Sequence, residues 1–188
     1  MAHIALFHSI LGLRSVEREA GERLRHAGHE AVVPDLFDGR TAAGIDEGFE
    51  VVGQIGWETI VKRGRRAIAD MPDETILVGC SMGAGVVCEL LSERPSTAGV
   101  ILLHAFPELP ADIASGLRVQ LHAAEPDEFA RTEQLPALQR SAKEADLDLE
   151  LFRYPGAGHY YIDRDLPDYD RPAAELTWQR MLDFLDGS

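Results

Sequence analysis

Short apolar runs rich in β-branched residues alternate along the chain with longer segments in which apolar residues recur every three or four positions. The first pattern is typical of strands and the second of amphipathic helices. Their alternation predicts βαβ units and a parallel sheet. The six predicted strands cover His3 to His8, Glu30 to Pro34, Thr75 to Gly79, Gly99 to His104, Arg118 to Ala123 and Asp148 to Tyr154.

Helical patterns fill the stretches between these strands. In the first, apolar residues from Leu13 to Ala27 share one face, and Gly28 follows where a helix C-terminus favours glycine. The other helical patterns cover roughly Gln54 to Ala69, Met82 to Leu91, Thr132 to Ala145 and Pro172 to Leu185. The last helix has two start signals, Asp170 near the N-cap position and Pro172 near N1.

The central strands are apolar throughout, as in Ile76 to Val78 and Val100 to Leu103, so helices should cover both faces of the sheet. This predicts an open, doubly wound α/β sheet, in which ligands bind at the carboxyl ends of the strands. No repeat or linker divides the chain. With 188 residues, we expect one domain over 1–188.

The chain is acidic, with 18 Lys and Arg against 32 Asp and Glu and a net charge of −14, so nucleic acid is not an expected partner. The basic run Lys62 to Arg66 lies in a helical pattern and is typical of the solvent-exposed face of a helix. No apolar run is long enough for a membrane span, and a strand follows Met1-Ala2 at once, so we expect a cytoplasmic protein without a signal peptide. Cys80 and Cys88 lie in apolar surroundings that favour reduced, buried thiols.

The strongest motif is Gly79-Cys80-Ser81-Met82-Gly83, a Gly-x-Ser-x-Gly sequence between a buried strand and a helix. A nucleophile elbow needs its serine on a strained strand-to-helix turn, with glycines that let the neighbouring backbone pack closely. Gly85 is expected to let the helix approach the sheet. The alternative is a glycine-rich turn of another doubly wound protein, but the spacing fits neither a dinucleotide site nor a phosphate loop. Cys80 should point toward the sheet interior.

A serine nucleophile requires a base and an acid farther along the chain. His159 follows the last strand in Gly156-Ala157-Gly158-His159, where it can reach Ser81; the alternative is a loop histidine without a role. Two carboxylates follow the fifth strand. Asp127 is preferred as the residue that orients His159, because Glu125 precedes a rigid proline and suits a role in shaping the turn.

Two backbone N–H groups are expected to form an oxyanion hole, from Met82 after the nucleophile and from Ile10 after the first strand. Ser9, in the same loop, either lines the pocket or caps the helix that begins near Arg14. Leu11 is predicted to contact substrate together with Ser9.

Other residues at the same edge of the sheet are candidates for the pocket. His104 at a strand end and Tyr160 beside His159 are predicted to contact substrate. The histidines at strand ends show no zinc-like spacing, so neither a metal nor a cofactor is predicted.

Several segments together resemble the dienelactone hydrolase family over nearly the whole chain. These are His8 to Gly12, Pro34 to Phe37, Gly79 to Gly83, His122 to Phe129, Ala157 to His159 and the C-terminal helix that ends in Leu182 to Leu185. The resemblance implies a triad of Cys or Ser, Asp and His in an α/β-hydrolase fold without a cap domain. It also implies an enzyme that opens lactones or cleaves small esters.

Three departures from the family pattern change what the resemblance implies. Ser81 and Ser9 replace a nucleophilic cysteine and its glutamate partner, and both changes point to serine esterase chemistry. The arginine that binds a substrate carboxylate, four residues after the histidine, is replaced by Asp163, with Arg164 next to it. The two antiparallel strands that the family pattern has at its amino end are not expected here, and we expect six strands in the order 2-1-3-4-5-6.

The predicted function is therefore a serine hydrolase that cleaves a small carboxylic ester or lactone through an acyl-enzyme. One alternative is a noncatalytic binding module that kept the elbow for structural reasons. Another is a thioesterase or acyltransferase with the same triad. The expected partner is the small-molecule substrate, and the protein is expected to be a monomer or a homodimer.

Overall fold

The computed structural model describes residues 1–110, 112–130 and 134–187. Strands and helices alternate along the chain as the sequence predicts. The strands are β1 His3–Phe7, β2 Glu30–Val32, β3 Ile76–Cys80, β4 Val100–Leu103, β5 Arg118–Glu125 and β6 Asp148–Pro155. The helices are α1 Ser15–His26, α2 Ile45–Ile55, α3 Trp57–Ala67, α4 Met82–Leu91, α5 Leu135–Glu144 and α6 Arg171–Asp186.

All six strands belong to one sheet in the order β2-β1-β3-β4-β5-β6, which confirms the predicted order. Each neighbouring pair is parallel. The central strands β3 and β4 are buried at every position, as strands covered on both faces should be. The sheet therefore has its carboxyl ends along one edge, where the loops that follow the strands meet.

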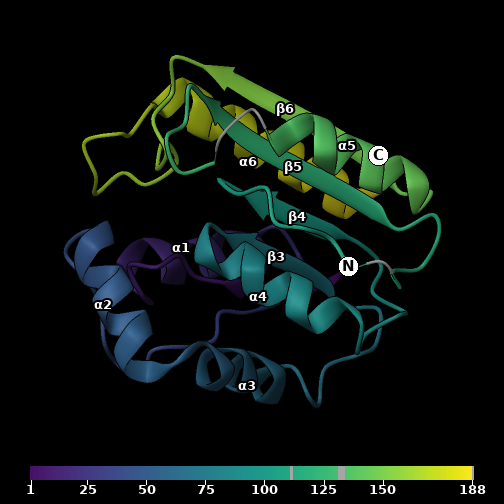
Figure 1. Ribbon diagram of the computed structural model, residues 1–188, viewed down its shortest axis with the longest axis horizontal. Coiled ribbons are helices and arrows are strands. Elements are labelled where there is room, and N and C mark those ends of the chain that lie inside the picture. The colour runs from purple at the N-terminus through teal and green to yellow at the C-terminus, as the bar shows by residue number, and fades with distance from the viewer. Residues whose placement is uncertain (111, 131–133, 188) are drawn as a thin grey trace.

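Helices cover both faces of this sheet (Figure 1). On one face, Leu24 of α1 and Met181 and Phe184 of α6 pack on side chains of β1, β3 and β4. The opposite face packs against α3 and α4 and, through Leu138, against α5. This arrangement is a doubly wound α/β sandwich without a cap domain. No helix in the described part of the chain is long and apolar enough to pass through a membrane.

The predicted helix over Gln54 to Ala69 is wrong in extent, because two helices cover this region. Gly56 has a φ of 85° and separates α2 from α3. Helix α2 begins at Ile45, nine residues before the predicted start at Gln54. At its start the Glu47 carboxylate accepts a hydrogen bond from the Ala43 amide (2.8 Å). The acidic first turn of Asp46 and Glu47 was the overlooked start signal.

The ends of several other elements match the prediction closely. Asp170 caps α6 by accepting a hydrogen bond from the Ala173 amide (3.1 Å), and Gly28 has a φ of 92° after α1.

Other boundaries differ from the prediction by a few residues. Strand β2 ends at Val32, two residues before the predicted Pro34. Helix α5 begins at Leu135. Its predicted start at Thr132 lies outside the described residues.

Candidate active site

Ser81 lies on a strained turn between β3 and α4. Its φ of 51° falls in the left-handed region that a residue with a side chain seldom adopts. Two backbone hydrogen bonds hold this conformation: the Ser81 amide donates to the Leu103 carbonyl (2.8 Å), and the Ser81 carbonyl accepts from the Ala84 amide (2.9 Å). The turn leaves the side chain at the N-terminus of α4, at the carboxyl edge of the sheet.

The two glycines of the motif are required by close packing. A Cβ on Gly79 would lie 2.5 Å from the Ala84 backbone, and one on Gly83 would lie 2.3 Å from the Phe7 carbonyl oxygen. Gly83, rather than Gly85, therefore lets α4 approach the sheet. Gly85 instead faces the Trp57 ring, 3.1 Å from where its Cβ would lie, so the role expected for Gly85 is corrected.

Ser81, His159 and Asp127 form a continuous hydrogen-bonded chain although they come from three separate loops. Ser81 Oγ lies 3.2 Å from His159 Nε2. On the other side of the ring, His159 Nδ1 lies 2.8 Å from Asp127 Oδ2 and 3.0 Å from Oδ1. Both His159 and Asp127 are buried. The geometry leaves Nε2 facing the serine hydroxyl, where it can accept the serine proton.

Asp127 is held as a carboxylate by its surroundings. Burial would raise its pKa, but hydrogen bonds from His159 and from the Ala130 and Phe129 amides outweigh that effect and lower the pKa. The two amides donate to Oδ1 at 3.0 and 2.9 Å. Glu125, the alternative acid, instead forms an exposed ion pair with Arg153. The structure thus brings Asp127, and not Glu125, to His159.

The loop after β1 is anchored by His8. Its Nδ1–H donates to the Ser9 carbonyl (2.7 Å), and its Nε2 accepts from the Leu36 amide (3.0 Å). Burial lowers the pKa of His8, so the ring stays neutral and keeps both bonds. Because Gly83 packs against the Phe7 carbonyl, this loop is close to the start of α4, which carries the Met82 amide. The structure thus brings the two predicted oxyanion donors, Met82 and Ile10, to the same corner.

Ser9 and Leu11, both predicted to contact substrate, make contacts within their own part of the chain, and Ser9 also lines a second cavity. The Ser9 hydroxyl accepts a hydrogen bond from the Leu11 amide (3.2 Å), and Leu11 packs in an apolar cluster with Ile10, Ala42 and Tyr160. Neither residue is among those that line the cleft beside Ser81. Ser9 does not cap α1 either, because the N-cap residue is Arg14, whose amide donates to Glu17 (2.9 Å). Both residues are buried, and the Ser9 hydroxyl is bonded within its own loop.

A cleft of about 510 Å³ opens over Ser81 and His159. Helix α2 supplies Ile45, Phe49 and Val52 to its wall. The hydrophobic pattern of the sequence did not predict this helix over its full length, and so did not predict these three lining residues. The other lining residues are Ile10, Trp57, Met82, Gly85, His104, Ala105, Phe106, Pro107, Phe129, Gln134 and Tyr160. Apart from Ser81, His159, His104 and Gln134, the described lining is predominantly apolar.

His104 lies in this cleft as a buried histidine without hydrogen bonds. It is 1% exposed, has a φ of 60°, and neither ring nitrogen has a partner among the described residues. Burial and the neighbouring His159 lower its pKa well below that of an ordinary imidazole, so the ring is neutral. His122, by contrast, is satisfied by Tyr154 and Gln120, and burial lowers its pKa to about 3.

The sequence of this chain matches that of a known protein family. The sequence profile of the dienelactone hydrolase family matches residues 2–187. The chain belongs to the dienelactone hydrolase family. It is therefore an enzyme of the hydrolase class.

Individual relatives of the dienelactone hydrolase family are distant in sequence. A protein of Synechocystis sp. described as a "Putative carboxymethylenebutenolidase" is 24% identical, over 95% of this chain and 82% of the relative. The crystal structure of a dienelactone hydrolase-like promiscuous phosphotriesterase from metagenomic libraries superposes with a TM-score of 0.81 at 18% identity, over 100% of this chain and 86% of that one. A cold-adapted esterase from an Arctic intertidal metagenomic library gives 0.68 at 16% identity, over 99% and 82%.

The position at which the dienelactone hydrolase family is expected to carry a substrate-binding arginine has a different use here. Asp163 is buried and forms an ion pair with Arg14, which also pairs with Glu17 (3.3 Å). Arg164 forms an exposed ion pair with Glu19. None of these five side chains lines the cleft beside Ser81. Arg164 therefore does not replace the missing arginine.

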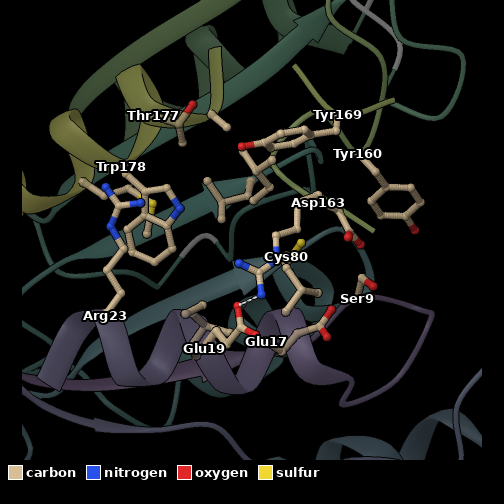
Figure 2. A pocket seen from close by; sticks show the side chains of 18 of the residues that line it. Ser9, Glu17, Glu19, Arg23, Cys80, Tyr160, Asp163, Tyr169, Thr177 and Trp178 are labelled. Atoms are coloured by element: carbon tan, nitrogen blue, oxygen red, sulfur yellow. Dashed lines mark ion pairs between the residues drawn. The ribbon is translucent and has the colours of Figure 1, made fainter. Parts of the chain in front are cut away.

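A second cavity, of about 290 Å³, lies between α1, α6 and the loop that follows His159. Figure 2 shows Trp178 and Arg23 at one end of this cavity and Tyr160 and Ser9 at the other. Cys80 lies in its wall and is a free thiol, as expected from its apolar setting. Burial raises the pKa of Cys80 and raises that of Cys88 to about 12, so neither thiol is activated as a nucleophile.

Proposed function

We propose that this protein hydrolyses a small carboxylic ester or lactone through an acyl-enzyme, with Ser81 as nucleophile, His159 as base and Asp127 as the residue that orients the base. The observation that carries the proposal is the hydrogen-bonded chain from Ser81 Oγ through both nitrogens of His159 to Asp127. That chain begins on a strained elbow and faces a cleft, which is the arrangement that activates a serine hydroxyl.

Acylation begins when Ser81 Oγ attacks the substrate carbonyl carbon while His159 Nε2 takes the hydroxyl proton. The carbonyl π electrons move to oxygen, and the amides of Met82 and Ile10 stabilise that charge. When the carbon–oxygen single bond to the leaving group breaks, His159 returns the proton to the departing alkoxide. Asp127 stabilises the imidazolium in between. The products are an alcohol, or the opened end of a lactone, and an ester on Ser81.

Deacylation repeats these steps with water as the nucleophile. His159 removes a proton from water as the water oxygen attacks the acyl carbon, and the same two amides stabilise the second oxyanion. The proton then passes to Ser81 Oγ as the acyl bond breaks, which releases the carboxylic acid and restores the enzyme. The low pKa of Asp127 supports this cycle, because an ionised carboxylate favours the imidazolium that forms twice.

The lining of the cleft supports an uncharged substrate. No Asp, Glu, Lys or Arg is found among the described residues that line it. A substrate carboxylate would lose hydration there without a cationic partner, which disfavours its binding. We propose that two polar side chains contact such a substrate: Tyr160 and the neutral His104 ring, whose two nitrogens have no partner within the described ranges.

A fluorophosphonate probe tests the nucleophile. We expect stoichiometric addition at Ser81, located by mass spectrometry, and turnover of p-nitrophenyl acetate that Ser81→Ala abolishes. Cys80→Ala is the matched control and should keep both labelling and turnover, because that thiol is buried and protonated. Labelling at Cys80, or an active Ser81→Ala variant, would disprove the proposed function.

A further inference from the structure

The side chain of Tyr160 ends in a buried hydroxyl that has no hydrogen-bond partner among the described residues. The residue is 5% exposed. A buried hydroxyl without a partner destabilises a folded protein, because it gives up its hydrogen bonds to water and gains none in return. Phenylalanine would fill the same space without this penalty. The unpaired hydroxyl therefore points to a use that is not structural.

The surroundings of Tyr160 place this hydroxyl beside the reacting groups. The ring packs edge-to-face on His159, with centroids 4.5 Å apart, and belongs to the same apolar cluster as Ile10. Tyr160 lines both the cleft that contains Ser81 and the second cavity, so it is the wall between them. In Figure 2 it lies at the same end of the second cavity as Ser9, which precedes the Ile10 donor.

The hydroxyls of Ser81 and Ser9, which both act on the pKa of Tyr160, are already engaged with other groups. Ser81 Oγ is paired with His159, and Ser9 Oγ accepts from the Leu11 amide. Burial raises the pKa of Tyr160, and the hydroxyls of Ser81 and Ser9 only partly oppose that effect. The phenol therefore keeps its proton throughout the working pH range. It is suited to donate a hydrogen bond and unsuited to act as a base.

We propose that the Tyr160 hydroxyl is a third donor of the oxyanion hole, which pairs with the substrate oxygen only when that oxygen becomes negative. The proposal rests on the proposed serine mechanism. No proton is transferred: the tyrosine O–H bond stays intact while it donates to the oxyanion beside the Met82 and Ile10 amides. A donor without a partner in the free enzyme stabilises the transition state selectively, because its hydrogen bond is formed only there.

Tyr160→Phe separates this role from a structural one, and Tyr161→Phe is the matched control. The Tyr161 hydroxyl is satisfied by Thr177 Oγ1 at 2.7 Å, so its loss should lower the melting temperature and leave kcat within about twofold. Tyr160→Phe should instead preserve stability and slow the reaction. We expect an unchanged or higher melting temperature, a kcat about 10- to 100-fold lower, and a KM within about threefold of wild type.

A transition-state analogue gives a second readout. A trifluoromethyl ketone adds reversibly to a serine nucleophile and places an oxyanion in the hole. Its inhibition constant with Tyr160→Phe should rise by the same factor as kcat/KM falls. A lower melting temperature, a kcat within twofold, or an unchanged inhibition constant for Tyr160→Phe would overturn the proposal.

Fluorophosphonate labelling distinguishes this failure from failure of the proposed function. If Ser81 labels and the wild type turns over, while Tyr160→Phe is as active as wild type, only the role of Tyr160 is wrong. If Ser81 does not label and the protein has no esterase activity, the serine mechanism is wrong, and the inference about Tyr160 is overturned with it.

Discussion

Single residues determine the tautomer of His159 in this site. Asp127 uses its two oxygens differently: Oδ1 accepts from two backbone amides, and Oδ2 makes the shorter contact with His159 Nδ1. The amides orient the carboxylate, and the carboxylate in turn keeps the imidazole proton on Nδ1. Nε2 is then free to accept the proton of Ser81, which the proposed mechanism requires.

Asp127→Asn tests whether the carboxylate determines the tautomer of His159, because it replaces one of the two carboxylate oxygens. Asparagine retains Oδ1 for the two amides but presents an NH₂ group to His159, which favours the tautomer with the proton on Nε2. We expect kcat for p-nitrophenyl acetate to fall about 10⁴-fold with little change in stability. Glu125→Gln is the control, because Glu125 forms only an exposed ion pair, and its activity should stay within about threefold. The reverse ranking would mean that Glu125 is the acid.

At the scale of elements, the elbow depends on how closely α4 approaches the end of β1. The contact passes through Gly83, which has no room for a side chain next to the Phe7 and His8 carbonyl oxygens. The same contact brings the Met82 amide close to the loop that carries Ile10. Packing of one helix against one strand end thus serves both the fold and the proposed oxyanion hole.

Gly83→Ala should therefore destabilise the fold strongly, by about 3 kcal/mol or more, because the new Cβ meets backbone that cannot move without separating α4 from the sheet. Gly53→Ala, in the exposed part of α2, is the control. Its Cβ would meet nothing within 4 Å, so alanine should stabilise the helix by about 0.5–1 kcal/mol. Urea unfolding measures both changes, and equal stability of the two variants would contradict this account.

At the scale of the whole molecule, three buried histidines make stability depend on pH. Burial lowers the pKa values of His8, His104 and His122. In the unfolded chain these imidazoles take up protons below a pH of about 6.5, whereas in the folded protein they stay neutral to lower pH. The unfolded state then binds more protons, and protonation drives unfolding. The stability that depends on neutral rings is complete above that pH and is lost below it.

The free energy of unfolding should accordingly fall as the pH drops from about 6.5 to 5, by about 1.4 kcal/mol per pH unit for each histidine that remains neutral in the fold. Glu17 opposes this trend, because burial raises its pKa, so the net slope is smaller than the sum. His122→Asn isolates one contribution. For this variant, the free energy of unfolding should change less steeply with pH than for wild type, by about 1.4 kcal/mol per pH unit. Identical slopes for the two proteins would show that His122 does not contribute to the pH dependence.

The sequence alone determined the architecture and the candidate triad, because both depend on patterns along the chain. Apolar runs and helical periodicity predicted the sheet and its order, and the elbow motif with a downstream acid and histidine predicted Ser81, Asp127 and His159. Helix α2 was missed although its acidic first turn was visible. The role of its apolar residues is visible only in the folded protein, where Ile45, Phe49 and Val52 line the cleft.

Only the tertiary structure decided which polar groups are paired. Arg14 and Asp163 are 149 residues apart, and their ion pair shows that the position of the expected arginine does not serve the cleft. Ser9 and Leu11 bond within their own loop, while the hydroxyl of Tyr160 and both nitrogens of His104 have no partner among the described residues. A sequence gives the donors and acceptors of each side chain. Whether they are satisfied depends on how distant elements pack, because burial and bond geometry are properties of the folded chain.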